Sequence, residues 1–148
     1  FGINLTLTYN VTDALQWQNK STLTKGYDVE ADLPLIDIPP FSTINELRYS
    51  NTKWNNFSAS LKSEWVLEQN EFPDFNFEVE DLSTPPPAYH LFHFYSEATF
   101  DLSNNTKLNV AFGVNNIFNT SYRNYLNRLR FFADDLGRNI TLQLQLNY

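Results

Sequence analysis

The segment NITLQLQLNY, residues 139–148, decides the fold predicted for this chain. Apolar and polar residues alternate along it without exception. The apolar positions are Ile140, Leu142, Leu144, Leu146 and Tyr148. Because successive side chains of a β-strand point to opposite faces, this alternation predicts a strand with one apolar and one polar face.

The same pattern opens the chain and recurs between its two ends. Residues 1–12 alternate in the same way, and runs of apolar and β-branched residues bounded by turn residues predict further strands. They are expected over residues 15–27, 41–50, 57–68, 90–102 and 107–118. Val66 breaks the alternation of the segment 57–68. The chain is therefore predicted to be all-β, with about seven strands.

The connections between these strands differ in length in a regular way. Short polar links near residues 13–14, 53–56 and 103–106 alternate with long links near residues 28–40, 68–89 and 127–137. One end of the sheet should therefore carry tight turns and the other end extended loops, as in outer-membrane barrels. Several predicted strands span about 10 to 13 residues, longer than is usual in soluble proteins and long enough to cross a bilayer.

These features predict a segment of an antiparallel, up-and-down transmembrane β-barrel. An odd number of strands would leave a barrel of this kind open, and an open edge exposes unpaired backbone groups to lipid. The chain is therefore expected to pair with further strands of its own barrel. It also begins at Phe1 without an export signal, so we expect it to be a piece of a mature exported protein.

The composition excludes several other classes of protein. No apolar run approaches the roughly 18 residues of a membrane helix. The absence of Cys excludes disulfides and thiolate chemistry, and the formal net charge of −7 argues against binding to nucleic acid.

Two motifs near the end of the chain resemble those of TonB-dependent outer-membrane receptors. The segment VNNIFNTSYR, residues 114–123, is similar to the family's V-x-N-L-F-[DN]-x-x-Y motif through Asn116, Phe118 and Tyr122. Gly137 and Arg138, followed by the alternating run to Tyr148, resemble the family's closing strand. A weaker match, LPLIDIPP at residues 33–40, resembles the L-P-x-I-P segment found further upstream in these receptors.

The resemblance implies the C-terminal part, residues 1–148, of a barrel of about 22 strands whose lumen is filled by a plug. The plug would lie outside this chain. The implied function is active uptake of a scarce nutrient across the outer membrane of a Gram-negative bacterium, driven by the TonB complex through the plug. Ligands of the family include ferric siderophores, cobalamin, haem, glycans and peptides, and prevalence favours a ferric siderophore or another iron complex. No catalytic residue and no cofactor are implied.

The resemblance also implies partners and an assembly signal. Outer-membrane lipid, lipopolysaccharide, the missing strands and the plug should surround this segment, and a small-molecule ligand should pass through the complete barrel. The assembly machinery of the outer membrane is expected to read the last strand by strand addition. The residues of this expected signal are Ile140, Leu142, Leu144, Leu146 and Tyr148.

Acidic residues are concentrated in the three long loops, which contain 12 of the 17 carboxylates and only Arg128 and Arg130 as cations. Negative potential at the outer rim could concentrate a cationic ligand. Candidate ligand-binding residues are Asp74, Glu78, Glu80, Asp81, Asp134 and Asp135. Ordinary loop solvation, or bridging to lipopolysaccharide through divalent ions, is the favoured interpretation of the same pattern.

The two histidines, His90 and His93, are three residues apart, so a strand would direct them to opposite faces and prevent a shared metal site. Placement in an aromatic belt at the membrane edge is the favoured interpretation. The lumen wall should be rich in hydroxyl and amide groups. Thr6, Thr8, Gln143 and Gln145 are its clearest candidates.

Two alternative classes of protein are also compatible with an aromatic-rich chain of alternating strands. A soluble β-sandwich that binds or adheres would need a single buried face and shorter strands. An outer-membrane barrel enzyme, such as a lipase, would need a serine, a histidine and a polar partner converging at the outer rim. His90 is the only plausible base for such an enzyme, and no partnered nucleophile is evident, so a receptor is favoured.

Overall fold

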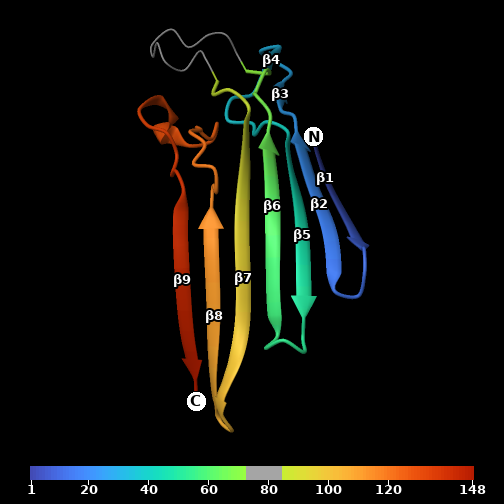
Figure 1. Ribbon diagram of the computed structural model, residues 1–148. Coiled ribbons are helices and arrows are strands. Elements are labelled where there is room, and N and C mark those ends of the chain that lie inside the picture. Colours follow the sequence, from blue (N-terminus) through green and yellow to red (C-terminus); the bar gives the residue numbers. More distant parts are fainter. Residues whose placement is uncertain (73–84) are drawn as a thin grey trace.

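The computed structural model describes residues 1–72 and 85–148 and contains one antiparallel sheet of seven strands (Figure 1). The strand order is β1-β2-β5-β6-β7-β8-β9, so strands that follow one another along the chain lie side by side in the sheet. The strands are β1 (Gly2–Asn10), β2 (Leu15–Thr24), β5 (Ser42–Asn51), β6 (Phe57–Val66), β7 (Tyr89–Ser103), β8 (Thr106–Asn115) and β9 (Asn139–Asn147). The up-and-down sheet predicted from the sequence is confirmed.

Strand boundaries depart from the predicted ones mainly next to the long loops. The predicted strand 15–27 was too long, because the chain leaves the sheet after Thr24 and enters a separate two-stranded hairpin, β3 (Tyr27–Asp28) with β4 (Leu33–Pro34). The predicted strand 107–118 was also too long. It ends at Asn115 because Asn116 takes φ 51°, a left-handed conformation that breaks the extended ladder. A short 3₁₀ helix, η1 (Arg128–Phe131), lies in the last loop.

The turns at one end of the sheet are tight and have specific chemistry. Between β5 and β6, Asn55 and Asn56 both adopt positive φ, 54° and 49°, which matches the twist that a hairpin turn requires. Between β1 and β2, the Thr12 hydroxyl accepts hydrogen bonds from the backbone N–H groups of Ala14 and Leu15. The described residues of the long links lie at the opposite end (Figure 1).

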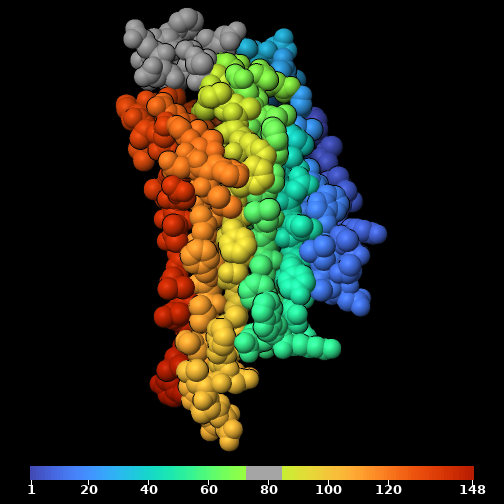
Figure 2. Space-filling view, in the orientation of Figure 1, coloured from blue at the N-terminus to red at the C-terminus, as the bar shows by residue number. Residues whose placement is uncertain are grey.

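The two faces of the sheet have opposite polarity. Side chains of β1 and β9 on one face are apolar and largely exposed, as shown by Ile3 at 57%, Leu142 at 65% and Leu144 at 62% of their full exposure. Within residues 1–72 and 85–148 the only other sheet is the short β3–β4 hairpin, which does not pack on the strands of the large sheet. The space-filling view shows the adjacent strands side by side in one layer (Figure 2). A surface of this size and apolarity is unfavourable in water.

The buried apolar core is correspondingly small and lies near the loop end of the sheet. Val66, Tyr89 and Leu91 form it, and Tyr122 from the last loop packs against it. These strand residues share the polar face of the sheet, because Val66 pairs directly with Tyr89. Val66 therefore interrupts the predicted alternation because it belongs to this cluster beneath the loops.

No helix in the parts of the chain that the structure describes is long and apolar enough to cross a membrane.

Candidate functional site on the polar face

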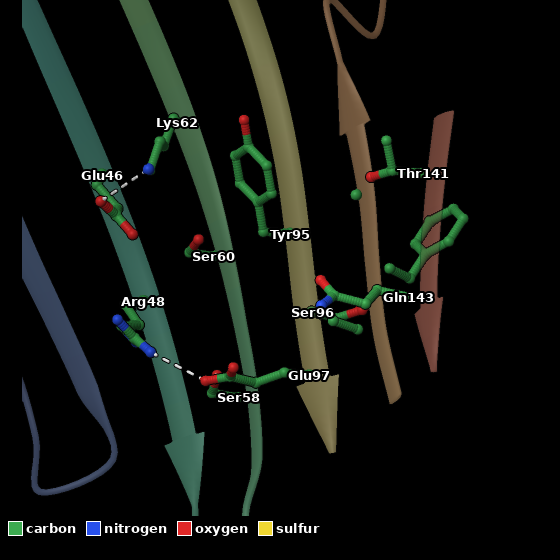
Figure 3. Close-up of a pocket in the computed structure, with 13 residues that line it drawn as sticks. Glu46, Arg48, Ser58, Ser60, Lys62, Tyr95, Ser96, Glu97, Thr141 and Gln143 are labelled. Atoms are coloured by element: carbon green, nitrogen blue, oxygen red, sulfur yellow. Dashed lines mark hydrogen bonds and ion pairs between the residues drawn. The ribbon is translucent and has the colours of Figure 1, made fainter. Parts of the chain in front are cut away.

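A groove of about 480 Å³ runs along the polar face of β5 to β9 (Figure 3). Its lining is dominated by charged, hydroxyl and amide side chains rather than apolar ones. The polar side chains on this face are Glu46, Arg48, Ser58, Ser60, Lys62, Tyr95, Glu97, Thr141 and Gln143. The predicted lumen residue Gln143 therefore lies in this groove, so we refer to the face as the lumen face.

Two ion pairs cross the groove. Lys62 on β6 lies 3.6 Å from Glu46, its direct cross-strand neighbour on β5. Arg48 on β5 reaches across β6 to Glu97 on β7, with 3.3 Å between Nη2 and Oε1 (Figure 3).

Short side chains on β6 make the second ion pair possible. Ser58 and Ser60 occupy the lumen face between Arg48 and Glu97, and the Ser58 hydroxyl donates to Glu97 at 2.9 Å. Because Arg48 and Glu97 are half or more exposed, their attraction contributes only about 0–1 kcal/mol to stability. Their main effect is to place fixed charges of both signs on the solvent-accessible lumen face of the sheet.

Gly113 on β8 allows two neighbouring side chains to approach the backbone closely. A Cβ at this position would lie 2.8 Å from Thr141 Oγ1 and 3.2 Å from Tyr95 Cδ1. The Tyr95 ring lies beside the glycine, and the Lys62 ammonium sits 4.9 Å from the centre of the same ring. The glycine thus makes room for an aromatic side chain within the polar groove.

His93 and Glu64 form a second polar group on this face, nearer to the loops. His93 Nε2 lies 3.4 Å from Glu64 Oε2, and His93 Nδ1 lies 3.2 Å from Asn115 Oδ1. The Nε2 atom is buried and makes no hydrogen bond of good geometry within the described residues. An imidazole and a carboxylate so placed can bind a hydrogen-bond donor or a cation that enters the lumen.

His90 lies on the opposite face, as predicted from the three-residue spacing. Its ring stacks on Trp65 with 3.9 Å between ring centroids, and the Ser63 hydroxyl lies 2.7 Å from its Nε2. His90 and His93 therefore do not converge. Across the two described stretches of chain, no three His, Asp or Glu residues are grouped in a way that could hold a metal ion.

Asn116, the central residue of the first family motif, ties the end of β8 into a turn. Only 2% of its surface is exposed. Its amide nitrogen donates to the Thr120 carbonyl at 2.8 Å, and its amide oxygen accepts from the Thr120 N–H at 2.8 Å. Asn116 thus has a structural role that uses both the nitrogen and the oxygen of its side-chain amide.

A second asparagine connects this turn to β9. Asn119 has φ 55°, and its Oδ1 accepts a hydrogen bond of 2.8 Å from the Arg138 N–H. A Cβ at Gly137 would lie 2.6 Å from the same Oδ1. Since the contact uses only a side-chain oxygen, an aspartate carboxylate could replace the Asn119 amide here. Gly137 and Arg138 therefore serve the link through their backbone.

The two motif aromatics lie on different sides of the sheet. Phe118 is 70% exposed and meets Phe92 edge to face at 5.2 Å, next to His90 on the apolar face. Tyr122 packs on Tyr89, with 4.7 Å between ring centroids, and so covers the buried cluster on the lumen face.

Two of the candidate acidic residues are engaged within the last loop. Asp134 accepts hydrogen bonds from the Ser121 hydroxyl and from Arg123 Nε, the latter at 2.7 Å. Asp135 accepts from the Asn124 N–H at 2.6 Å and from the Asn127 amide at 2.7 Å. Both carboxylates therefore stabilise the loop that carries η1.

The other four candidates, Asp74, Glu78, Glu80 and Asp81, lie outside the described residues. The residues of the expected assembly signal have their predicted orientation: Ile140, Leu142, Leu144 and Leu146 share the apolar face and are more than half exposed. Tyr148 follows β9 and is 99% exposed.

The charged residues of the groove were missed by the sequence analysis because no motif marks them. Alternation alone places Glu46, Lys62 and Glu97 on polar faces of separate strands. Their pairing depends on the register between strands, which the lengths of the turns determine. If the odd–even alternation is carried from each strand to its neighbour, starting at the predicted lumen residues, these three side chains fall on the lumen face.

An extended antiparallel sheet with an exposed apolar face, a charged polar face, tight turns at one end and long loops at the other has the architecture of a transmembrane β-barrel wall. The sheet is similar to part of a solved structure described as the copper transporter OprC, with a TM-score of 0.79 and 21% sequence identity. The match covers 99% of this chain and 22% of the OprC chain. The predicted fold, an antiparallel up-and-down sheet of seven strands that matches part of a larger protein, is therefore confirmed.

The chain thus spans about a fifth of the length of the OprC chain. No protein-family model and no curated protein matches the chain.

Proposed function

We propose that this chain forms part of the barrel wall of a TonB-dependent transporter that imports a scarce nutrient across the outer membrane. The observation that carries the proposal is the two-faced sheet, whose whole length matches part of the OprC barrel. In this function the apolar face contacts lipid, and the lumen face contacts the plug and the passing ligand.

The distribution of polarity supports a membrane location over the soluble alternative. A β-sandwich buries the apolar face of one sheet against another, whereas the apolar side chains of β9 are more than half exposed. The partners expected in the membrane are lipid, lipopolysaccharide, the remaining strands, the plug, the TonB complex and the assembly machinery.

Transport is favoured over catalysis by the chemistry of the lumen face. Ser58 and Ser60 lie beside charged residues, but His90 lies on the other side of the sheet. The only plausible base considered for a barrel enzyme is therefore directed away from the groove. Charged, hydroxyl and amide groups on a wetted wall suit the passage of a hydrated solute.

The ligand we propose is a metal nutrient, with a ferric siderophore or another iron complex as the first candidate on the prevalence of such ligands in the family. Copper is the second candidate, because OprC is a copper transporter. The Glu64 and His93 pair supports a cationic solute in general, since an imidazole and a carboxylate are ligands for first-row metal ions.

Two measurements on the intact parent protein test these proposals. First, we expect it to fractionate with the outer membrane and to show heat-modifiable mobility on a gel, and a soluble parent would contradict the proposed location. Second, a deletion strain should lose TonB-dependent accumulation of radiolabelled iron supplied as a siderophore complex. Loss of copper accumulation alone would favour the second ligand.

The assembly role of the last strand stays a prediction with its own test. Tyr148→Ala and Leu144→Asn should each lower the amount of heat-modifiable barrel in the outer membrane without lowering synthesis. Gln143→Asn, which changes the lumen face of the same strand, is the matched control. Normal insertion of both altered proteins would contradict the assembly role.

A further inference from the structure

The His93 imidazole and the Glu64 carboxylate face each other on the lumen face, at the loop end of the groove. His93 is two residues from the groove residue Tyr95 on β7, and Glu64 is two residues from the groove residue Lys62 on β6. Because side chains two residues apart on a strand share a face, both lie on the side of the sheet that lines the groove. His93 Nε2 and Glu64 Oε2 are 3.4 Å apart.

The contacts of His93 Nδ1 indicate which ring nitrogen carries the proton. Nδ1 lies 3.2 Å from Asn115 Oδ1, and the Tyr95 hydroxyl donates a hydrogen bond to the same oxygen. An amide oxygen only accepts hydrogen bonds, so Nδ1 is the donor in this contact. The Asn116 N–H also approaches Nδ1, at a longer 3.4 Å. The shorter contact favours a proton on Nδ1, which leaves the lone pair of the neutral imidazole on Nε2.

The lone pair of His93 Nε2 therefore faces a carboxylate oxygen, and two acceptors in this position repel each other unless a positive ion joins them. Within the described residues, Nε2 makes no hydrogen bond, and Glu64 has no ion-pair partner apart from His93. Lys62, the cross-strand neighbour of His93, is directed elsewhere. Its ammonium lies 3.6 Å from Glu46 and over the Tyr95 ring (Figure 3).

The distance between Nε2 and Oε2 fits two ligands of one tetrahedral metal ion. Bonds of about 2.0–2.1 Å from the metal to each ligand, at the tetrahedral angle, place the two ligand atoms about 3.3–3.4 Å apart. Ligands at about 90° around a square-planar or octahedral ion would be only about 2.9 Å apart. A direct hydrogen bond between the two groups would also be shorter, at about 2.7–3.2 Å.

We infer that His93 and Glu64 form a binding site for a divalent transition-metal ion that prefers tetrahedral coordination, such as zinc. The inference deepens the proposed function, because it rests on this face bordering the wetted lumen. An imidazole nitrogen and a carboxylate oxygen are both ligands that zinc accepts. Calcium and magnesium require a larger set of oxygen ligands.

Two coordination positions of such an ion stay open to the lumen. The parts of the chain that the structure describes supply no third His, Asp or Glu at this place. The Glu64 side chain is 31% exposed, so water or a donor atom of the transported solute can complete the coordination. Asn115 is a positioning residue, since its oxygen accepts the Nδ1 proton and so orients the ring and the lone pair of His93.

Titration of the intact parent with cobalt(II) in detergent tests the inference, because tetrahedral cobalt absorbs visible light far more strongly than octahedral cobalt. We expect a tetrahedral cobalt spectrum that added zinc abolishes and that His93→Gln removes. The matched control is His90→Gln, which alters the only other histidine of the chain, on the opposite face of the sheet. This control should leave the cobalt spectrum unchanged.

Two further variants separate ligation from a general effect on the fold. Glu64→Gln keeps the size of the side chain but removes its charge, and it should also abolish the tetrahedral spectrum. Asn115→Ala should weaken cobalt binding by about tenfold or more. Equal cobalt spectra of the His93→Gln protein and the unaltered parent would overturn the inference. An octahedral spectrum that depends on His93 would overturn the tetrahedral assignment.

Heat-modifiable mobility is measured on every variant to show that the barrel is folded. A folded barrel that binds no cobalt would contradict only the metal site, whereas a parent absent from the outer membrane would contradict the proposed function itself.

Discussion

Individual side chains at the end of β8 decide where the sheet stops and where the last loop begins. Asn116 combines a left-handed backbone, almost complete burial and two hydrogen bonds to the backbone of Thr120. Asparagine adopts this conformation more readily than other residues with a side chain. Asn116, which carries the resemblance to the first receptor motif, therefore has a direct structural role in closing a turn.

We predict that Asn116→Ala destabilises the barrel by about 2 kcal/mol, from the loss of two hydrogen bonds and the added cost of left-handed backbone. Urea unfolding of the intact parent in lipid vesicles measures the change. Asn109→Ala is the control, because that amide makes no side-chain hydrogen bond within the described part of β8 and its neighbours. Equal effects of the two substitutions would contradict the role of Asn116.

We make a similar prediction of lost stability for Gly113 on the lumen face. Gly113→Ala should cost about 1–2 kcal/mol, because its methyl group would overlap Thr141 Oγ1 and press on the Tyr95 ring. The double substitution Gly113→Ala with Thr141→Ala removes the closest contact and should recover much of the loss. A double-mutant cycle measures this coupling, and strictly additive effects would show that the overlap is not the cause.

The last loop, residues 116–138, is organised by its own carboxylates and cations. Asp134 binds Ser121 and Arg123, while Arg130 lies 4.5 Å from the ring centroids of both Tyr125 and Phe131. Arg130 also approaches Asp37 in the first long loop at 3.9 Å. Arg130 and Asp37 thus connect the last loop to the first long loop at the loop end of the sheet.

The pH dependence of this loop follows from Asp134. The Ser121 hydroxyl and the Arg123 guanidinium hold the pKa of the Asp134 carboxyl below its ordinary value of 3.8. A lowered pKa in the folded state means that the ionised form is stabilised by folding. The contribution of Asp134 to loop order should therefore be complete above about pH 4 and decline as the pH falls from there through the lowered pKa.

Carboxyl chemical shifts of Asp134, measured by NMR on the intact parent labelled at aspartate, test this expectation. Ser121→Ala should raise the pKa of Asp134 toward its ordinary value, because it removes the largest cause of the shift. Ser103→Ala, at the end of β7 farthest from the loops, is the control and should leave that pKa unchanged. An unshifted value in the unaltered protein would contradict the arrangement.

The strands were predictable from the sequence to the extent that alternation and turn residues specify them. The strand order follows from the alternation of short and long links, and β9 differs from its predicted range by one residue at its C-terminal end. The hairpin β3–β4 was not predictable, because two residues in each strand are too few to show a period.

The site was less predictable than the strands. Asn19 and Asn45 share the parity of Leu7 and Leu47 on the apolar face, so they contradict the polarity that alternation assigns to that face. The ion pair between Arg48 and Glu97 spans three strands, and it depends on small residues between them. Neither arrangement is contained in the pattern of any one strand.

The complete sheet has two edges, β1 and β9, and each pairs on one side only within the described residues. Unpaired backbone groups of such edges are not tolerated in hydrocarbon. Adjacent antiparallel strands continue this sheet in a closed barrel, which removes both edges. The stability of the seven strands in a membrane therefore depends on strands beyond these two edges.

We predict that residues 1–148 expressed alone with an export signal do not form a heat-modifiable barrel, whereas the intact parent does. The physical reason is the pair of open edges, together with the large exposed apolar face. Membrane fractionation and protease protection measure the difference. Stable, protected insertion of the isolated chain as a monomer would contradict the requirement for additional strands.

The contrast between the two ends of the sheet also determines where this protein can change length. The turn between β5 and β6 holds two consecutive left-handed asparagines, so one added residue there would shift the pairing and exchange the lipid and lumen faces of a strand. The described parts of the long loops do not set the pairing of the seven strands in this way, and Val29 between β3 and β4 is 86% exposed. Insertions should therefore accumulate at the loop end, and on the proposed function this is also the end where antigenic variation is expected, while the tight turns keep a constant length.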